Sequence, residues 1–372
     1  MKTLVLGGYG NFGARICRAL AGDPAIQLLV GGRDRVRAEA MARELGAGAQ
    51  GVAIDLDSPG FTGELRQLGV ELLIHTAGPF QQQAYRVAEA AAAAGCHYID
   101  LADGRRFVCD FAAAMNPAFR AAGRVAISGA STVPALSSAV IDHLCAGWQR
   151  IDTIDICIAP AQTAPRGRAT IEAVLSYCGA PIQVWTEGRW QARPGWGQPE
   201  RIEFSRLRPR LGALCDIPDL ELFPVHYRVG RRVMFRAALE VGLTQRVFAM
   251  LARLRTWGVL PQPRRLGGLL NAMAPALDFL GTSLGGMVVR ATGADAQGQA
   301  VARSWHITAD HDHGPEIPCM AAILLARKLA AGAALPVGAH ACLGLLKLAE
   351  FKPEFDRWGM VSEVVDDGTP AA

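Results

Sequence analysis

The sequence predicts an α/β fold: a Rossmann-type doubly wound parallel sheet, together with a second α+β domain. Short apolar runs alternate with helical patterns over residues 1–130, which is typical of parallel strands joined by helices. A glycine-rich turn, Gly7 to Gly13, separates the first apolar run from the first helical pattern. After Asp142 the pattern changes to alternating strands and hairpins, which indicates a separate domain.

The glycine-rich turn lies between an apolar run at 2–6 and a helical pattern at 14–20. Its glycines fit the spacing G-x-G-x-x-G, which allows a tight turn, close approach of a pyrophosphate and close packing of helix on strand. Unpaired N–H groups at the start of the helix would face the phosphates. The alternative is a tight turn that binds nothing. The expected cofactor-binding residues are Gly7, Gly8, Tyr9, Gly10, Asn11, Phe12 and Gly13.

The end of the second expected strand, 27–32, indicates which dinucleotide binds. NAD sites usually place an acid there for the ribose hydroxyls, whereas an arginine accommodates the 2′-phosphate of NADP. Arg33 occupies this place, and Asp34 follows one position later. The sequence therefore predicts NADP as the cofactor, with NAD as the alternative that Asp34 leaves open. Arg35 and Arg37 are interpreted as a solvated helix face.

The third and fourth strands supply further candidates. Helix 34–46 leads into strand 51–57, where Asp55 either contacts the adenine edge or is a loop acid that caps the next helix. Strand 70–76 follows. Because ligands of open α/β sheets bind at the carboxyl ends of strands, the residues at its end should lie beside the nicotinamide ribose: Thr76, Ala77, Gly78 and Pro79.

The remaining elements complete two domains. Helix 82–94, strand 97–101, helix 107–122 and strand 124–129 finish the parallel sheet. Later elements are strand 151–158, helix 169–178, strands 182–186 and 189–192 around a Glu187-Gly188 turn, a hairpin of 288–293 with 300–309, and helix 318–331. We expect a nucleotide-binding domain over 1–145, an α+β substrate or dimerisation domain over 146–313, and a helical segment over 314–365 that packs back on the first domain.

Composition excludes several classes of protein. A chain of 372 residues with 51% hydrophobic and 19% charged residues is long enough for two domains. The net charge of +4 does not suggest a nucleic-acid partner. The nine cysteines form no C-x-x-C motif, which suits a reduced, cytoplasmic protein. The most apolar stretch, 266–289, is interrupted by polar residues, proline and glycines, so we expect no integral membrane segment.

Several stretches resemble the saccharopine dehydrogenase-like oxidoreductases, a family of NADP-linked two-domain enzymes. They are the Gly7–Gly13 turn, Gly32-Arg33, Ala77 to Phe80, His97 to Leu101, Ser131 to Ser137, Gly314 to Pro318 and Gly338-Ala339. The resemblance implies an oxidoreductase that acts on a small molecule. Many members have Gly-Glu after the aspartate that corresponds to Asp100 in the strand 97–101. This chain has Asp103-Gly104-Arg105-Arg106 there. The middle of the chain lacks the family's amino-acid-substrate motifs, so saccharopine is not the expected substrate.

Candidates for proton transfer to the atom that receives a hydride are Asp103, His226 and Tyr227. The alternative for each is an ordinary surface or loop residue. His75 is interpreted as a packed strand residue rather than a base, and Arg166 and Arg168 as either ordinary exposed arginines or a clamp for a substrate carboxylate. The run Asp310 to His313, with Glu316, has the residue types of a metal site. Its place between a strand and Gly314-Pro315 favours a polar turn, so no metal is predicted.

The sequence thus favours an NADP-dependent oxidoreductase that transfers a hydride to or from a C=O, C=N or activated C=C bond. The alternatives are a non-catalytic NADP-binding sensor or assembly subunit, and an accessory reductase for lipid-like or polyketide-like chains. A homodimer is also left open. Residues 244–290 are apolar with interspersed arginines. They fit buried helix packing, an apolar lid or dimer contact, or a helix lying on an anionic membrane.

Overall fold

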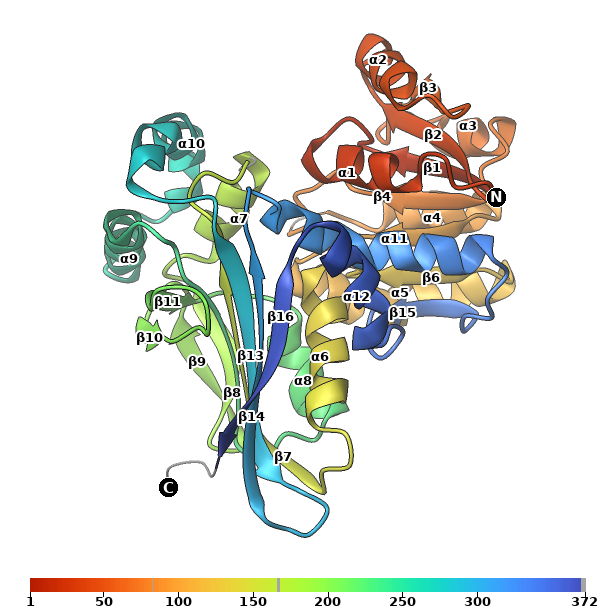
Figure 1. Cartoon of the computed structure of the whole chain (residues 1–372). Coiled ribbons are helices and arrows are strands. Elements are labelled where there is room, and N and C mark those ends of the chain that lie inside the picture. Colours follow the sequence, from red (N-terminus) through yellow and green to blue (C-terminus); the bar gives the residue numbers. More distant parts are fainter. Residues whose placement is uncertain (82, 166–167, 369–372) are drawn as a thin grey trace. The chain divides into compact units, whose positions relative to one another are not determined.

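A computed structural model describes residues 1–81, 83–165 and 168–368 of the chain. The chain divides into two compact units (Figure 1). The first consists of Met1–Leu136 and Glu316–Leu346, and the second of Ser137–Pro315 and Lys347–Ala372. None of the described helices is both long enough and apolar enough to cross a bilayer.

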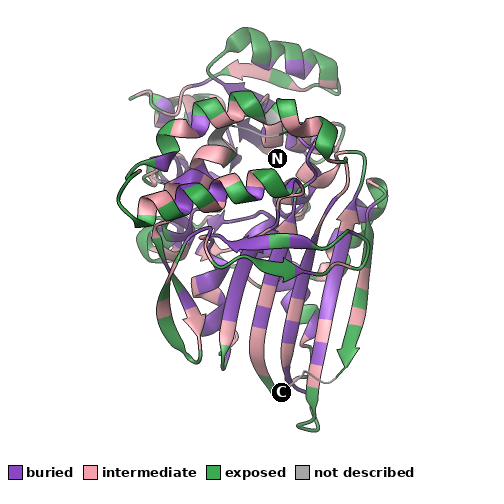
Figure 2. Cartoon of the chain, turned by 90° about the vertical axis from the view of Figure 1, so that its left-hand side faces the viewer, coloured by how far each residue is buried: buried purple, intermediate pink, exposed green. Residues whose placement is uncertain are grey.

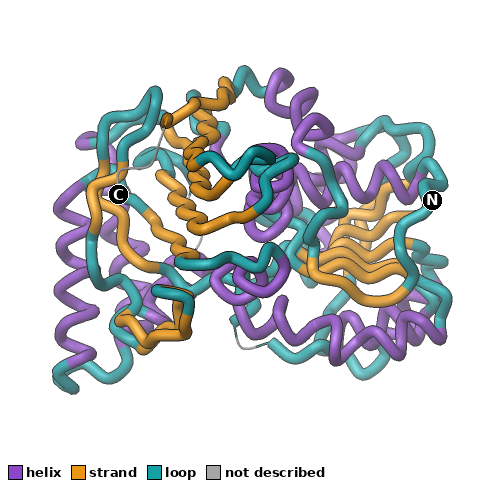
Figure 3. Tube along the Cα trace, turned by 90° about the horizontal axis from the view of Figure 1, so that it is seen from below, coloured by secondary structure: helices purple, strands orange, loops and turns teal. Residues whose placement is uncertain are grey.

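The first unit contains a seven-stranded sheet in which every pair of neighbouring strands is parallel. Figure 3 shows helices on both faces of this sheet. Its strand order is β15-β6-β5-β4-β1-β2-β3, which contains the Rossmann order 3-2-1-4-5-6. The predicted doubly wound fold is confirmed. The strands are β1 (Lys2–Leu6), β2 (Gln27–Gly32), β3 (Gln50–Ala53), β4 (Leu72–His75), β5 (His97–Asp100), β6 (Val125–Ser128) and β15 (Gly338–Ala341).

The helices of the first unit pack through apolar faces. Ile16, Cys17 and Leu20 of α1 (Asn11–Leu20) are fully buried. Helix α11 (Ile317–Ala330) packs on α1, and Arg327 Nη2 donates a hydrogen bond to the Ala19 carbonyl oxygen at 3.0 Å. The other helices are α2 (Arg35–Leu45), α3 (Phe61–Gln67), α4 (Arg86–Ala94), α5 (Arg105–Ala121) and the π-helix η1 (Thr132–Leu136).

Two details of this unit differ from the sequence-based expectation. Strand β3 ends at Ala53 rather than at residue 57, because Asp55 Oδ1 accepts a hydrogen bond from the Asp57 backbone N–H and starts a turn. Helix α3, which follows this turn, was not predicted. Its seven residues include Thr62 and Gly63, which are poor helix formers.

The second unit is built on a nine-stranded mixed sheet. Seven of its strands run in the order β10-β11-β12-β7-β13-β14-β16, and the β8–β9 hairpin joins β12. Both residues of the predicted Glu187-Gly188 turn have positive φ angles, as a two-residue hairpin turn requires. The strands are β7 (Arg150–Ala159), β8 (Pro181–Thr186), β9 (Arg189–Pro194), β10 (Glu200–Ile202), β11 (Arg210–Leu214), β12 (Arg232–Ala237), β13 (Gly285–Ala294), β14 (Ala300–Ala309) and β16 (Val361–Gly368).

The helices of the second unit include α6, which contacts strands β13 and β14, and α8, which contacts β12. Trp196 and Phe223 are fully buried. These helices are α6 (Ser137–Leu144), α7 (Arg168–Tyr177), α8 (Asp219–His226), α9 (Gly242–Thr256), α10 (Gly267–Met273) and α12 (Leu348–Arg357), with 3₁₀ turns η2 (Pro263–Leu266), η3 (Ala274–Leu280) and η4 (Gly314–Glu316).

The end of the chain differs from the expected segment 314–365. Residues 316–346 join the first unit, where β15 extends the parallel sheet beside β6. From Lys347 onward the chain returns to the second unit. Strand β16 pairs antiparallel with β14. This pairing satisfies backbone groups of β14 that would otherwise form an open sheet edge.

Candidate dinucleotide site

The glycine-rich turn and the loop after β4 lie side by side at the carboxyl ends of two central strands. The strand order reverses between β1 and β4, and this is the point at which open α/β sheets bind ligands. Leu6 is paired in register with His75. Thr76 then ties the two loops together, because its backbone N–H and its Oγ1 both donate to the Leu6 carbonyl oxygen, at 3.0 and 2.8 Å.

The turn is packed so closely that side chains do not fit at its glycines. Gly7 has a φ angle of +84°, and a Cβ atom there would lie 2.8 Å from Thr76 Oγ1. A Cβ atom on Gly13 would overlap the Gly7 carbonyl oxygen and lie 2.7 Å from its carbon. One on Gly10 would lie 3.0 Å from the same oxygen. The backbone therefore forms a cradle that a Cβ atom would fill, as a pyrophosphate-binding turn requires.

Helix α1 begins directly at this cradle. Gly10 is its N-cap and is exposed, and as a glycine it has no side chain with which to cap the helix. The N–H groups of the first turn are thus available for an anion at the positive end of the helix. Arg15 Nη1 donates to the carbonyl oxygen and Oδ1 of Asn11, at 2.8 and 2.7 Å, and Arg15 Nε forms an ion pair with Glu316 at 2.9 Å. These contacts fix the first turn, so the residues present fit a dinucleotide pyrophosphate.

The end of β2 is organised around Tyr9. Its ring lies over Gly32, where a Cβ atom would come 2.6 Å from Tyr9 Cζ. Its hydroxyl accepts a hydrogen bond from the Asp34 backbone N–H at 3.0 Å. The guanidinium of Arg37 stacks 4.6 Å from the ring centroid, a contact that the sequence analysis missed when it treated Arg37 only as part of a solvated face.

Arg33 and Asp34 have different environments at this strand end. The Arg33 side chain is exposed, so it is available to a ligand phosphate. Asp34 is the N-cap of α2, and its Oδ1 accepts from the Arg37 backbone N–H at 3.1 Å. One oxygen of this carboxylate is therefore bound by the protein, whereas NAD binding would use the carboxylate for the ribose hydroxyls.

The loop after β4 is held by Gln83, whose Nε2 donates to the carbonyl oxygens of Ala77 and Pro79 at 2.8 and 3.0 Å. Gly78 is exposed, and the nearest atoms to a Cβ there would be those of the Phe80 ring at 3.5 Å and the Phe80 backbone nitrogen at 3.8 Å, which are ordinary contacts. The space beside Gly78 is thus open. Asp55, the candidate contact for adenine, is half-buried in the turn after β3.

His75 lies beneath this loop and is buried. Its Nδ1 is 3.1 Å from the Tyr98 hydroxyl, and burial lowers the pKa of the imidazole to about 4. It is therefore a neutral, packed strand residue, as interpreted from the sequence. Asp100, on the neighbouring strand, accepts from Gly129 N–H and Ser128 Oγ at 2.8 and 3.0 Å. Burial raises its pKa to about 6. These contacts link β5 to β6.

The three candidates for proton transfer are divided between the two units, with Asp103 in the first. Asp103 is exposed, and its Oδ1 accepts from Gln81 Nε2 at 3.1 Å. The Tyr227 hydroxyl donates to Asp142 Oδ1 at 2.9 Å, and burial together with the charge of Asp142 raises its pKa. The hydroxyl thus joins α8 to α6. His226 is exposed at the end of α8.

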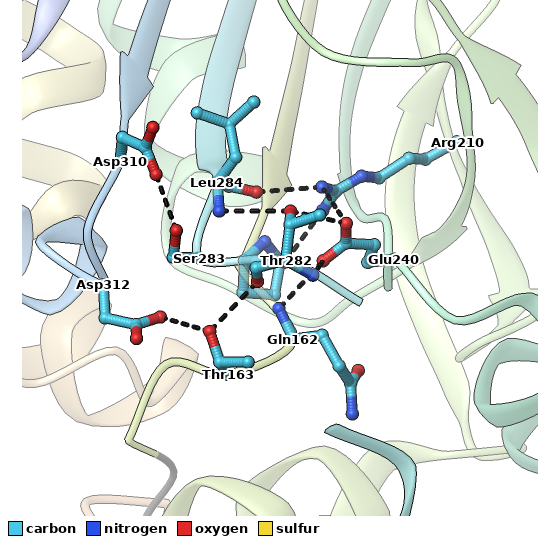
Figure 4. A network of polar contacts seen from close by, with 10 residues as sticks. Gln162, Thr163, Arg210, Glu240, Thr282, Ser283, Leu284, Asp310 and Asp312 are labelled. Carbon is cyan, nitrogen blue, oxygen red and sulfur yellow. Dashed lines mark hydrogen bonds and ion pairs between the residues drawn. The ribbon is translucent and has the colours of Figure 1, made fainter. Parts of the chain in front are cut away.

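Side chains of the run Asp310 to His313 are bonded to other residues of the second unit. Asp310 accepts from Ser283 Oγ at 2.6 Å, Asp312 accepts from Thr163 Oγ1 at 2.6 Å, and His313 Nδ1 is 3.1 Å from the Trp358 carbonyl oxygen. Figure 4 shows the two aspartates facing these hydroxyls. Across the described residues no group of three or more potential ligands is placed to hold a metal ion. The clamp candidate Arg166 and the Arg168 side chain lie outside the described residues.

Fold and site together define a protein with a Rossmann dinucleotide-binding domain. Residues 3–133 match the family described as the saccharopine dehydrogenase NADP-binding domain. The resemblance inferred from the sequence is therefore confirmed over residues 3–133. The sequence matches no curated protein.

Two solved structures extend the likeness over nearly the whole chain. Saccharopine dehydrogenase (L-Glu forming) from Saccharomyces cerevisiae is 11% identical, with a TM-score of 0.71 and coverage of 98% of this chain and 99% of that one. Homospermidine synthase from Legionella pneumophila, solved with NAD, is 10% identical, with a TM-score of 0.60 and coverage of 98% and 91%. At such identities the likeness shows the fold. The family match over residues 3–133 supports an oxidoreductase.

Proposed function

We propose that the protein is an NADP-dependent oxidoreductase that transfers a hydride to or from a C=O, C=N or activated C=C bond of a small molecule. The observation that carries this proposal is the cradle of Gly7, Gly10 and Gly13 at the strand-order reversal, next to an open space at Gly78. The bound cofactor would supply the hydride from its nicotinamide ring. The protein would hold the pyrophosphate at α1 and the ribose beside Thr76 to Pro79.

The preference for NADP rests on Arg33 and Asp34. Arg33 is exposed at the end of β2, while Asp34 caps α2. A charge-assisted contact to the 2′-phosphate contributes about 1.5–3 kcal/mol, or roughly ten- to hundredfold in Kd. We therefore expect NADPH to bind that much more tightly than NADH, and Arg33→Ala to remove the difference without weakening NADH.

Fluorescence titration of both cofactors measures this preference. Arg35→Ala is the matched control, because Arg35 is also exposed on this segment but pairs with Glu39 at 3.4 Å. It should retain the preference. Equal affinity of the unaltered protein for NADH and NADPH would show that Arg33 does not select the cofactor.

Turnover is tested by transfer of deuterium from labelled NADPH to a panel of aldehydes, imines and enoyl compounds. We expect transfer to one class, and its loss in Gly78→Val, because the valine side chain would occupy the open space proposed for the nicotinamide. NADPH binding should change little in this variant. Gly78→Ala is the graded control, since its Cβ atom makes only an ordinary contact with Phe80 at 3.5 Å.

A non-catalytic NADP-binding sensor is the second candidate function. It is favoured by the engagement of Tyr227, whose hydroxyl bonds to Asp142 and Ser138 instead of being free to donate a proton. Tight NADPH binding without deuterium transfer to any of the three substrate classes would support the sensor. Transfer to any class would exclude it.

A further inference from the structure

Large apolar side chains are exposed in a cluster over residues 243–280 of the second unit. Of the fifteen exposed large hydrophobic residues among the described positions, eight lie in this segment of about a tenth of the chain. Trp257 and Phe279 are 71% and 82% exposed. Exposed apolar residues scattered singly are ordinary, whereas a concentration of them marks an interaction site. We call this set the apolar surface: Leu243, Met250, Trp257, Val259, Leu269, Met273, Phe279 and Leu280.

Helix α9 shows that the exposure follows one helical face. Positions 243, 246, 250, 253 and 257 recur at spacings of three and four and are all exposed, so they share a face. The opposite face packs into the unit through Phe248 and Leu251, and the Phe248 ring lies 5.0 Å from that of Trp196. The buried-packing interpretation therefore holds for one side of α9 only.

The exposed face of α9 alternates apolar and basic residues in place of an ordinary polar surface. In order along this face lie Leu243, Arg246, Met250, Arg253 and, directly after the helix, Trp257; Gly242 and Thr256 are exposed as well. Helix α10 adds Leu269 and Met273, one turn apart. The turn η2 contacts both helices, and η3 contacts α10. Figure 2 faces this side of the unit, and exposed positions recur along its helices.

The segment carries a net positive charge. Residues 243–280 contain five arginines and one aspartate, Asp278, giving a net charge of +4. Asp278 accepts a hydrogen bond from Gln162 Nε2 at 3.1 Å, and Arg255 donates to the carbonyl oxygens of Ser176 and Cys178. Within the described part of the chain, Arg246, Arg253 and Arg265 have no ion-pair partner.

We propose that this surface docks on an anionic lipid bilayer, with its aromatic and aliphatic side chains in the outer hydrocarbon and its arginines at the lipid phosphates. Guanidinium groups bind phosphates in a forked geometry, and tryptophan and phenylalanine favour the bilayer interface. A second copy of the chain fits less well. A symmetric contact would bring the same positively charged surface of both copies together, and like charges oppose such a contact.

The test is flotation of the whole protein with phosphatidylcholine vesicles that contain or lack phosphatidylserine. We expect binding to the phosphatidylserine vesicles at low salt, weakening as salt screens the arginines. The double variant Trp257→Glu/Phe279→Glu should reduce binding by about tenfold or more. Arg246→Gln/Arg253→Gln, which leaves the apolar side chains in place, should reduce binding to the anionic vesicles.

Matched controls come from the same unit. Val225→Glu alters another exposed apolar residue, 74% exposed on α8, and Arg208→Gln alters an exposed arginine outside the segment. Both should bind vesicles as the unaltered protein does. Failure of the unaltered protein to float with phosphatidylserine vesicles at low salt would overturn the proposal. So would a dimer in solution that Trp257→Glu converts to a monomer without any vesicle binding, because the surface would then be a contact between copies.

Discussion

Gly13→Ala is expected to weaken dinucleotide binding by roughly a hundredfold. The added Cβ atom would overlap the Gly7 carbonyl oxygen and lie 2.9 Å from Gly8 Cα. Both are backbone atoms of the cradle, so no side-chain rotation relieves the conflict. Either α1 moves away from β1 or the turn changes shape, at a cost of about 3 kcal/mol, or roughly a hundredfold in Kd. Fluorescence titration with NADPH measures this loss.

Variants at two further glycines distinguish damage to the binding site from damage to the folded structure. A Cβ atom on Gly10 would lie 3.0 Å from the Gly7 oxygen and meet nothing else within 4 Å. Gly10→Ala should therefore weaken NADPH binding with little change in thermal stability. Gly63 lies in α3, where a Cβ atom would meet nothing within 4 Å, so Gly63→Ala should bind normally. Normal binding by Gly13→Ala would show that this turn does not hold the pyrophosphate.

The first unit was predictable because its signals are local. A strand, a glycine turn with fixed spacing and a helix follow one another within twenty residues, and the structure places them as β1, the cradle and α1. The pairing of the turn with Thr76 was also predictable, since carboxyl ends of parallel strands meet at one sheet edge. The stacking of Arg37 on Tyr9 is a contact between positions that are distant in the sequence, so no local spacing of residues predicts it.

The second unit was less predictable because its elements depend on tertiary partners. Strand β12 contains Arg232 and Arg236. These two charged residues interrupt the apolar run from which a strand would be predicted. Arg232 Nη2 lies 2.6 Å from Asp155 Oδ2 on the neighbouring strand β7, and Arg236 pairs with Glu200 on β10. Strand β16 is also polar, and its place is set by pairing with β14. Such long-range pairing leaves no periodic signal in either segment.

The ends of the second sheet are held by Glu240, which lies between β12 and α9 (Figure 4). Its Oε2 accepts from the backbone N–H groups of Gln162 and Thr282, each at 3.0 Å, and its Oε1 accepts from Thr282 Oγ1 at 2.7 Å. Arg210 Nη2 lies 3.6 Å from Oε1, and only 7% of the Arg210 side chain is exposed. One carboxylate thus joins the segments that follow β7 and precede β13 to the first residue of β11.

Glu240→Ala is expected to lower the free energy of unfolding of the second unit by about 3–5 kcal/mol, because it leaves the buried Arg210 charge without its partner. Glu363→Ala is the control. Glu363 pairs with Arg206 at 3.1 Å, but the two side chains are 36% and 52% exposed, so its loss should cost no more than about 1 kcal/mol. All seven tryptophans lie in the second unit, so tryptophan fluorescence during urea unfolding follows this unit alone. Equal losses in the two variants would show that the Glu240 network contributes no more to stability than an exposed ion pair does.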